Sequence, residues 1–436
     1  MRIFLLFCLL AFFISCSPKP AESGDLNRIR MDESDEVYIM TKNIQTGEEN
    51  KILLNRNRGN TFIFGFENGS EDDTSIPEFQ QVLNARVGAG HERKGGAKNQ
   101  HVVKTGVIEI TEHDSKERYA TRLQFEYQNP KHPQLQYLYK KEKLAELKQD
   151  SEFETLIHVL NWTRQQWEPG SPEIYPPWNA NVILSSIRAG QTSGFCAQYS
   201  QVLVQTLTAM GHQARYLWLT EHFGVEVFSN ELNQWLIIDP LYNCVIKQGD
   251  KFLNAYDVFT ALQSEDKGAG LFIYNTLTKS EIRGDLRTKI LHNYSRFVID
   301  LKNTQVEEKK PGMSYITEFW KHSAMWAHPF NLEYEFTSGP AIATPWLQDL
   351  YFKINQSSVE ILEVNEAFIG IDFTTNTPYH AYFEISADNG KTYERTKGPL
   401  KIGVNVNGLS FMVRSVNVMG VAGPSARFAY TFTPKK

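Results

Sequence analysis

The stretch that decides the fold reads SGFCAQYSQVLVQTLTAMG over residues 193–211. Its apolar residues, Leu203 and Leu207 among them, recur at helical spacing, and Gly211 is a typical helix stop. A glycine-containing loop therefore leads into a helix whose first turn contains Cys196. Unpaired backbone N–H groups and the positive end of the helix dipole lie there; they favour a thiolate and can hold an oxyanion. We expect a nucleophilic cysteine, with a buried structural cysteine as the alternative.

Two polar residues follow at the ends of expected strands. His222 opens the run HFGVEVF at 222–228, and Asp239 closes the run WLIID at 235–239. Neighbouring antiparallel strands bring two such side chains within hydrogen-bond reach, while the helix brings Cys196 to the imidazole. The histidine then takes the thiol proton and returns it to the leaving group, and the carboxylate fixes its tautomer. The expected roles are Cys196 as nucleophile, His222 as base and Asp239 as its orienter.

Four ordered motifs resemble the transglutaminase-like superfamily: GxCxxYS at 194–200, MGHQAR at 210–215, HxxxEV at 222–227 and WxxIDP at 235–240. The resemblance is close over residues 194–240 and loose over residues 153–167, which is under a third of the chain. It implies a papain-like core with a Cys-His-Asp triad. Members of that family usually have a bulky aromatic residue where this chain has Gly224, so we expect an opened rim of the cleft.

Other polar residues carry weaker hypotheses. Gln191 is a candidate oxyanion donor, like the upstream glutamine of papain-like enzymes, or a surface glutamine. Trp178 either lines the cleft as a second oxyanion candidate or packs in the core. We expect Arg215 to pair with a carboxylate in a structural role, and His212 to cap helix carbonyls. No cluster has zinc-ligand spacing and no glycine-rich phosphate loop is present, so neither metal nor cofactor is expected.

The first residues have the pattern of an export signal. A positive start and the apolar run from Ile3 to Ile14 predict a signal peptide over 1–15. The small residue before Cys16 resembles a bacterial lipobox, which implies lipidation of Cys16 and a linker over 16–35; an ordinary cleaved signal peptide is the alternative. Lipidation implies the cell envelope and a membrane as partner, with the outer membrane favoured because Ser17 is not aspartate. An exported chain could also join Cys196 to Cys244 in a disulfide. Cys244 itself has no base nearby that would activate its thiol.

The remaining patterns divide the chain into folded regions. A length of 436 residues predicts several domains, and a net charge of −5 without a basic stripe argues against nucleic acid as partner. Short strands predict a β-rich N-terminal region over 36–135. Helices followed by strands predict an α+β core over 136–349. Strands with a period of two predict a β-sandwich of immunoglobulin or fibronectin type III kind over 350–436. The run SADNGKTY at 386–393 resembles a sialidase Asp-box, but one copy is more typical of a hairpin turn.

These observations lead to two functional hypotheses. The first is a cysteine enzyme that cleaves or transfers an amide or peptide bond through a thioester, with hydrolysis favoured and a protein, peptide or glycopeptide as substrate. The second is a non-catalytic lipoprotein that binds glycan or peptide on the same scaffold, because fold alone does not establish chemistry.

Overall fold

The computed structural model describes residues 29–31, 37–42, 49–54, 99–114, 121, 123–172, 175–304, 306, 322–326, 342–344 and 346–435. The expected signal peptide and Cys16 lie outside these residues. The chain divides into two compact units, residues 1–64 and 65–436. The described part of the first unit is an antiparallel sheet in the order β1 (Ile29–Met31), β2 (Val37–Lys42) and β3 (Glu49–Leu54). None of the helices in the described ranges combines the length and apolarity needed to cross a membrane.

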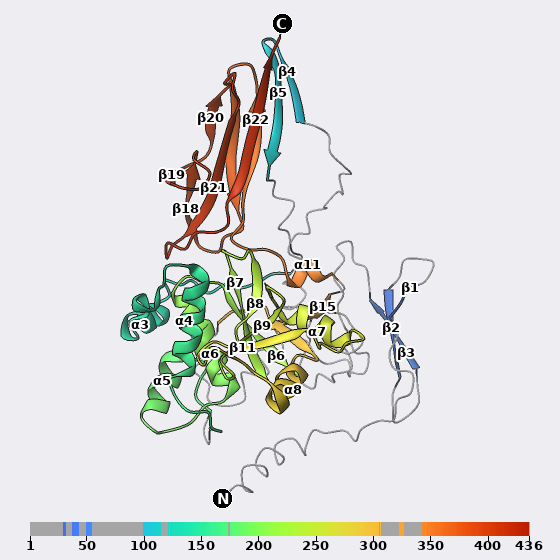
Figure 1. The fold of residues 1–436 in the computed structure, drawn as a ribbon, viewed down its shortest axis with the longest axis vertical. Coiled ribbons are helices and arrows are strands. Elements are labelled where there is room, and N and C mark those ends of the chain that lie inside the picture. The colour runs from blue at the N-terminus through green and yellow to red at the C-terminus, as the bar shows by residue number, and fades with distance from the viewer. Residues whose placement is uncertain are drawn as a thin grey trace, which may run out of the picture. The chain divides into compact units, whose positions relative to one another are not determined.

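The second unit mixes helices with mostly antiparallel sheets, which confirms the α+β class. Its described helices are α3 (Pro133–Lys141), the 3-10 helix η2 (Leu144–Leu147), α4 (Glu152–Arg164), α5 (Ala180–Arg188), α6 (Cys196–Ala209), α7 (Ala255–Gln263), α8 (Gly284–Asn293) and α11 (Leu347–Leu350). In Figure 1 helices α3 to α6 gather on one side of strands β6 to β8, and α7 and α8 lie on the other.

Two sheets accompany these helices. The six-stranded sheet has the order β15 (Ile342–Thr344), β14 (Ser323–Trp326), β13 (Phe297–Asp300), β6 (Ala214–Leu219), β7 (Phe223–Ser229) and β8 (Gln234–Ile237). The smaller sheet has the order β10 (Lys251–Phe252), β9 (Cys244–Gln248), β11 (Leu271–Asn275) and β12 (Ser280–Glu281). The strands expected in the runs 222–228 and 235–239 are therefore present as β7 and β8.

Helix α6 is the central element of the second unit. All of its residues are buried, and it contacts helices α3, α4 and α5 as well as strands β6 and β7. Its end follows the expected pattern, because Gly211 adopts a positive φ of 94° and the N–H of His212 donates to the carbonyl of Leu207 at 2.9 Å. A helix enclosed in this way holds the residue at its first turn in one fixed position.

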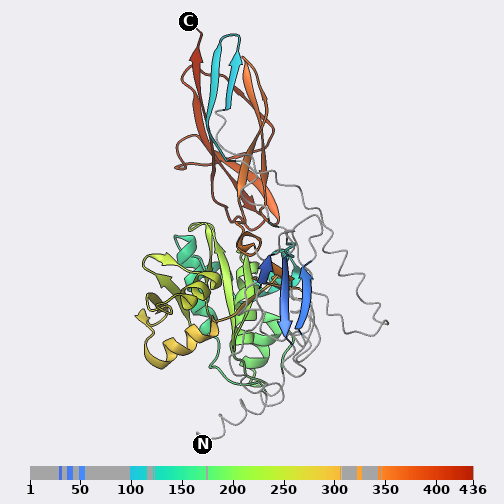
Figure 2. The ribbon, with the colours of Figure 1, turned by 90° about the vertical axis from the view of Figure 1, so that its right-hand side faces the viewer.

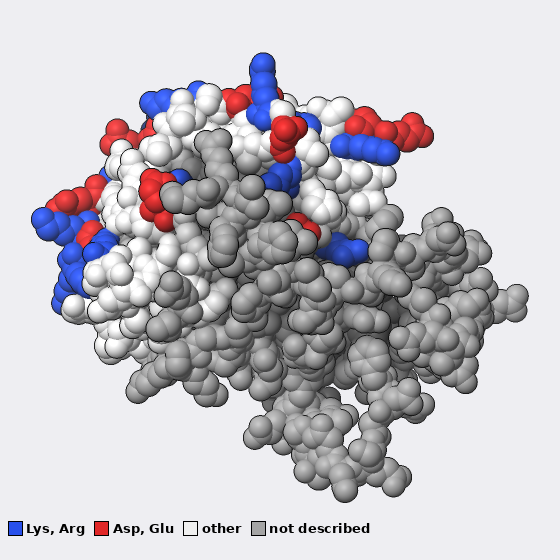
Figure 3. Space-filling model, turned by 90° about the horizontal axis from the view of Figure 1, so that it is seen from below, with Lys and Arg blue, Asp and Glu red and all other residues white. Residues whose placement is uncertain are grey.

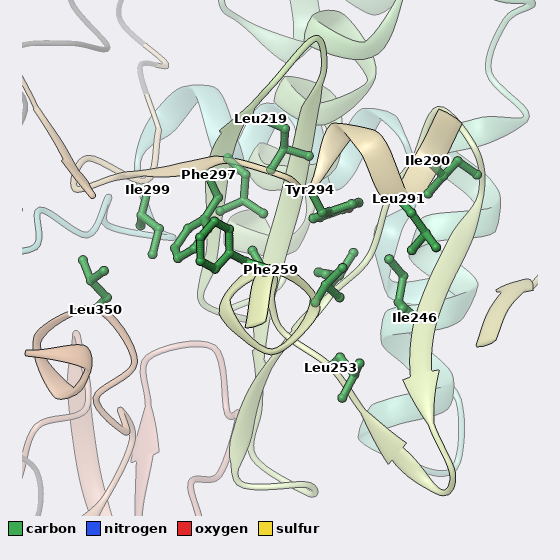
Figure 4. Close-up of a cluster of buried hydrophobic side chains, with 14 of the residues drawn as sticks. Leu219, Ile246, Leu253, Phe259, Ile290, Leu291, Tyr294, Phe297, Ile299 and Leu350 are labelled. Carbon is green, nitrogen blue, oxygen red and sulfur yellow. The ribbon is translucent and has the colours of Figure 1, made fainter. Parts of the chain in front are cut away.

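A hydrophobic cluster packs the two sheets of this core against helices α7 and α8 (Figure 4). It draws on strands β6, β9 and β13 and on helices α7 and α8; its members include Leu219, Ile246, Phe259, Ile290, Leu291, Tyr294, Phe297 and Ile299. Full burial of each such side chain contributes on the order of 1.5–3 kcal/mol. The cluster thereby fixes β6 and the end of α8 against each other.

The C-terminal strands form two sheets around a second core. One sheet is β16 (Ser357–Val364), β17 (Phe368–Thr375) and β20 (Leu400–Gly403); the other is β19 (Glu394–Thr396), β18 (His380–Ser386), β21 (Leu409–Asn417), β22 (Ala426–Pro434), β5 (Gly106–His113) and β4 (Asn99–Val103). Buried residues from both sheets share one cluster that includes Ile108, Ile371, Val413 and Phe428. Figures 1 and 2 show β4 and β5, in cyan, beside the red strand β22.

This pairing differs from the expected grouping of residues 36–135 into one region. β5 hydrogen-bonds to β22 over most of its length, so residues 99–113 complete the sheet formed near the C-terminus. The physical reason is that Ile108 and Ile110 of β5 are buried in the core that the two C-terminal sheets share. In the 386–393 hairpin, the Asp388 carboxylate accepts bonds from Ser386, Lys391 and Thr392 of the same turn, as the hairpin interpretation expects.

Candidate active site

Cys196 is the first residue of α6, and the loop before it is held on both sides. The N–H of Phe195, the residue that caps the helix, donates to Oε1 of Gln198 at 3.1 Å. The carbonyl of Gly194 accepts from Nε1 of Trp167 at 3.1 Å and from the N–H of Gly170 at 2.9 Å. These bonds orient the thiol by orienting the backbone that carries it.

Tyr199, one turn further along α6, braces the same loop. Its ring stacks on Trp167 with centroids 4.0 Å apart, and its hydroxyl donates to the Trp167 carbonyl. Nη1 of Arg164 donates to that hydroxyl at 3.3 Å. Burial raises the pKa of Tyr199 to about 12 against the opposing charge of Arg164, so the tyrosine remains a donor. The loosely matching segment 153–167 thus supports the loop before Cys196.

His222 stands at the turn between β6 and β7. The N–H of Leu219 donates to the His222 carbonyl at 2.9 Å, which closes the turn. Oγ of Ser200 donates to the carbonyl of Phe223 at 3.0 Å and ties the start of β7 to α6. Because Ser200 lies one helical turn after Cys196, this bond brings the imidazole to the thiol.

Asp239 follows β8 and is completely buried. Its Oδ2 lies 2.7 Å from Nε2 of His222, and its Oδ1 accepts the backbone N–H groups of Leu241 and Tyr242 at 3.1 and 3.2 Å. Its own backbone exchanges two hydrogen bonds with Cys244, of 2.9 and 3.1 Å. The carboxylate is therefore held in one orientation with Oδ2 toward the histidine.

The electrostatics of this pair favour a charged imidazole. Burial opposes the charged form, but the carboxylate of Asp239 and then a hydrogen bond and charge from Cys196 raise the pKa of His222 to about 10. Since Nε2 is engaged by Asp239, Nδ1 is the ring nitrogen left for the thiol. The structure therefore brings the three expected residues together in the order Cys196, His222, Asp239.

The second cysteine has the opposite environment. Burial, with a smaller contribution from the charge of Asp239, raises the pKa of the Cys244 thiol well above its ordinary value. Both Cys196 and Cys244 are free and buried, so they are not joined in the disulfide considered above. Cys244 is thus held as a neutral thiol, and the two sulfurs differ in chemistry.

The two oxyanion candidates lie differently. Trp178 is only 1% exposed; its ring packs 4.9 Å from that of Tyr216, and its carbonyl accepts from Nε2 of Gln205 at 2.9 Å. Gln191 is exposed in the turn after α5, where its N–H donates to the carbonyl of Ser186 at 3.0 Å. This geometry favours the packing interpretation of Trp178 and the surface interpretation of Gln191.

Arg215, which was expected to have a structural role, forms a buried ion pair with another motif residue, Glu226. Nε and Nη2 of Arg215 donate to Oε2 of Glu226 at 2.8 and 2.7 Å, with Arg215 1% and Glu226 0% exposed. Arg215 thus pairs with a carboxylate as expected. His212 caps a helix carbonyl as expected, through its backbone N–H, which donates to the carbonyl of Leu207 at 2.9 Å; its Nδ1 lies 3.6 Å from Oε1 of Glu152.

Gly224 does not open the rim of a cleft, so that expectation was wrong. The residue is buried on β7, and a Cβ at this position would lie 3.4 Å from Leu219, 3.5 Å from the hydroxyl of Tyr294 and 4.0 Å from Oδ2 of Asp239. Gly224 therefore lies behind the His-Asp pair.

Two tyrosines beside the triad were not singled out from the sequence. The ring of Tyr242 lies 5.0 Å from that of His222, and the hydroxyl of Tyr294 lies 3.5 Å from Oδ2 of Asp239. Tyr242 lies two residues after the last residue of the Asp239 motif, and that proximity was the one signal available; no local pattern marks Tyr294.

The comparisons with known proteins add no relative. No protein-family model matches the chain, and a search of curated proteins finds no match. Across the part of the chain that the structure describes, no three His, Cys, Asp or Glu side chains gather in a way that could hold a metal ion. On the face drawn in Figure 3, basic and acidic side chains are interspersed over the described surface.

Proposed function

We propose that this protein is a cysteine enzyme of transglutaminase-like type that attacks an amide or peptide carbonyl through Cys196. One observation carries the proposal: a buried His222 is held by Asp239 at 2.7 Å through Nε2, and Cys196 at the first turn of a buried helix acts on the same ring. A nucleophile, a base and an orienter within hydrogen-bond reach are the elements of such catalysis.

The geometry supports a two-step reaction. The Sγ thiolate of Cys196 attacks the carbonyl carbon and forms a C–S bond, and the negative charge moves to the carbonyl oxygen. The C–N bond then breaks as the imidazolium of His222 gives its proton to the leaving nitrogen, which leaves a thioester. Water or an amine attacks the thioester, His222 accepts its proton, and the C–S bond breaks to return the thiolate.

We also propose the fold of the two domains, the type of reaction and the membrane anchor. The core would be papain-like and the two C-terminal sheets an immunoglobulin or fibronectin type III sandwich. Hydrolysis is the favoured outcome, on a protein, peptide or glycopeptide substrate. Lipidation at Cys16 would attach the protein to the outer membrane of the cell envelope. Cys16→Ser should then release the protein from membranes in cell fractionation; retention on membranes would place the anchor elsewhere.

Competitive alkylation tests the nucleophile directly. Iodoacetamide should label Cys196 at least about tenfold faster than Cys244 at pH 6.5, because a thiolate reacts and a buried neutral thiol does not. Mass spectrometry of the tryptic peptides gives both rates in the same sample, so Cys244 is an internal control. Equal rates, together with no effect of His222→Ala, would contradict the enzyme proposal and favour the binding lipoprotein.

Activity profiling then addresses the substrate. Wild-type protein and Cys196→Ala are incubated with peptide, glutaminyl and glycopeptide amides, with and without an added amine. Catalysis at Cys196 is supported if wild type forms ammonia or peptide products and Cys196→Ala does not. Incorporation of the added amine into the product distinguishes transfer from hydrolysis.

A further inference from the structure

Tyr294 reaches the triad from an element that is distant in sequence. It follows the last residue of α8, is fully buried and lies in the core cluster beside Leu219 and Leu291 (Figure 4). Its hydroxyl lies 3.5 Å from Oδ2 of Asp239, the same oxygen that faces His222. The four donors on this carboxylate are thus two backbone N–H groups on Oδ1, and the histidine and the tyrosine on Oδ2.

The tyrosine can act only as a donor in this position. Burial, and then the charge of Asp239, raise the pKa of Tyr294 well above its ordinary value. Its hydroxyl therefore keeps its proton across the pH range in which an enzyme works. A neutral hydroxyl aimed at a carboxylate oxygen withdraws negative charge from the side that faces the imidazole.

Gly224 provides the space for this contact. A Cβ at Gly224 would lie 3.5 Å from the Tyr294 hydroxyl and 4.0 Å from Oδ2 of Asp239, which is ordinary van der Waals contact. Alanine therefore fits, whereas a residue with Cγ atoms must displace the hydroxyl or the carboxylate. The backbone of Gly224 pairs with Leu217 of β6, so the residue itself has little freedom to move away.

We propose that Tyr294 is a positioning residue of the Cys196–His222–Asp239 site, and that Gly224 keeps open the space through which its hydroxyl reaches Oδ2 of Asp239. This inference rests on the proposed function, because it assigns a role within the same site.

The direction of the effect follows from the groups that face His222. These are Cys196 from α6, Asp239 and Tyr242 from the segment after β8, and Tyr294 through Asp239; Cys244 and Glu226 also act on Tyr294. Loss of the Tyr294 hydroxyl leaves more negative charge on Oδ2, which stabilises the imidazolium. With a more stable imidazolium beside Cys196, alkylation of this cysteine should persist to lower pH.

The experiment measures the rate of iodoacetamide alkylation of Cys196 between pH 4 and 9 in the full chain. Tyr294→Phe should move the acid limb of this profile down by roughly half a pH unit, since the contact is long for a charged hydrogen bond. The matched control is Tyr351→Phe, which removes the hydroxyl of a partly buried tyrosine that donates to the carboxylate of Glu226 at 3.0 Å. Its profile should follow that of wild type even if its melting temperature falls.

Substitutions at Gly224 provide an independent readout. Gly224→Ala should leave the profile unchanged, and Gly224→Val should reproduce the shift of Tyr294→Phe. The double variant Gly224→Val/Tyr294→Phe should shift no further than either single variant, because both remove one contact.

The outcomes separate this inference from the proposed function. An unshifted or upward-shifted profile for Tyr294→Phe, or a shift equal to that of Tyr351→Phe, overturns the role of Tyr294. If Tyr294→Phe folds, additive shifts in the double variant overturn it as well; if Tyr294→Phe does not fold, a wild-type profile for Gly224→Val overturns it instead. An unchanged profile for His222→Ala contradicts the proposed function itself.

Discussion

Arg215→Met tests the energetic role of the buried ion pair behind the site. The guanidinium supplies two hydrogen bonds to Oε2 of Glu226 and one, of 2.6 Å, to the carbonyl of Leu350. It also lies 3.9 Å above the ring of Trp235. The substitution keeps most of the apolar stem but leaves Oε2 of Glu226 without these donors.

The magnitude follows from burial. Arg215 is 1% and Glu226 0% exposed, so the remaining carboxylate cannot be solvated by water. Breaking a buried pair by removing one partner costs about 3–5 kcal/mol, and loss of the ring contact with Trp235 adds up to about 1 kcal/mol. We expect Arg215→Met to destabilise the core by about 4 kcal/mol.

The assay is urea unfolding followed by tryptophan fluorescence, because Trp235 packs directly on the guanidinium. Arg215→Met/Glu226→Gln removes both charges, and we expect it to recover at least about 2 kcal/mol of the loss. The exposed pair Arg283–Glu281 is the control, where Arg283→Met should cost less than about 1 kcal/mol. A cost below about 1 kcal/mol for Arg215→Met, or a double variant as unstable as the single one, would refute the reasoning.

Three further predictions follow from the same structure. The pKa of His222 is raised from its ordinary value of 6.5 to about 10, so its contribution to stability is fully present below pH 6.5 and is lost as pH rises toward 10. The urea midpoint of wild type should therefore exceed that of His222→Gln most at pH 6 and least at pH 10; a constant difference would contradict this. Asp239→Asn removes the charge that stabilises the imidazolium of His222, so alkylation of Cys196 at pH 6 should slow by about tenfold or more. The control, Asp257→Asn, removes a surface partner of Lys251 and should leave the alkylation rate unchanged. Ile108→Ala should destabilise the two-sheet C-terminal domain by about 2–4 kcal/mol, measured by limited proteolysis, because Ile108 is 0% exposed in its core. Val102→Ala, at an 83% exposed position, should have little effect. Equal susceptibility of the two variants to proteolysis would place β5 outside that core.

The arrangement of Cys196, His222 and Asp239 could be predicted from the sequence because its determinants are local. The helix start at Cys196 depends on the glycine loop before it, and the positions of His222 and Asp239 depend on the ends of short apolar strands. Each of these patterns extends over fewer than about ten residues, the range over which propensity and periodicity are informative. The order of the motifs then predicted which three side chains meet.

The missed features depend on contacts that no local pattern encodes. The period-two pattern of β5 identifies a buried face but not the strand that pairs with it, and its partner β22 lies more than three hundred residues away. Tyr294 follows an ordinary helix, and its approach to Asp239 depends on how α8 packs over β6. Gly224 was misread for the same reason, since the Tyr294 hydroxyl, 3.5 Å from the position of its absent Cβ, comes from the residue that follows that distant helix.

The two buried carboxylates of this core face partners that differ in their ability to exchange a proton. Glu226 and Asp239 are both 0% exposed, and each is held by donors on both oxygens. Glu226 faces Arg215, whose guanidinium does not release its proton in proteins, so Arg215 has no proton to exchange with a neighbour. Asp239 faces His222, whose imidazole can exchange a proton with the neighbouring thiol. Burial therefore encloses an ion pair at Arg215 and Glu226, whereas at His222 and Asp239 it makes a titratable imidazole responsive to its neighbours. This is why we expect the single hydroxyl of Tyr294 to shift the pH profile of Cys196 alkylation, which depends on His222 and Asp239.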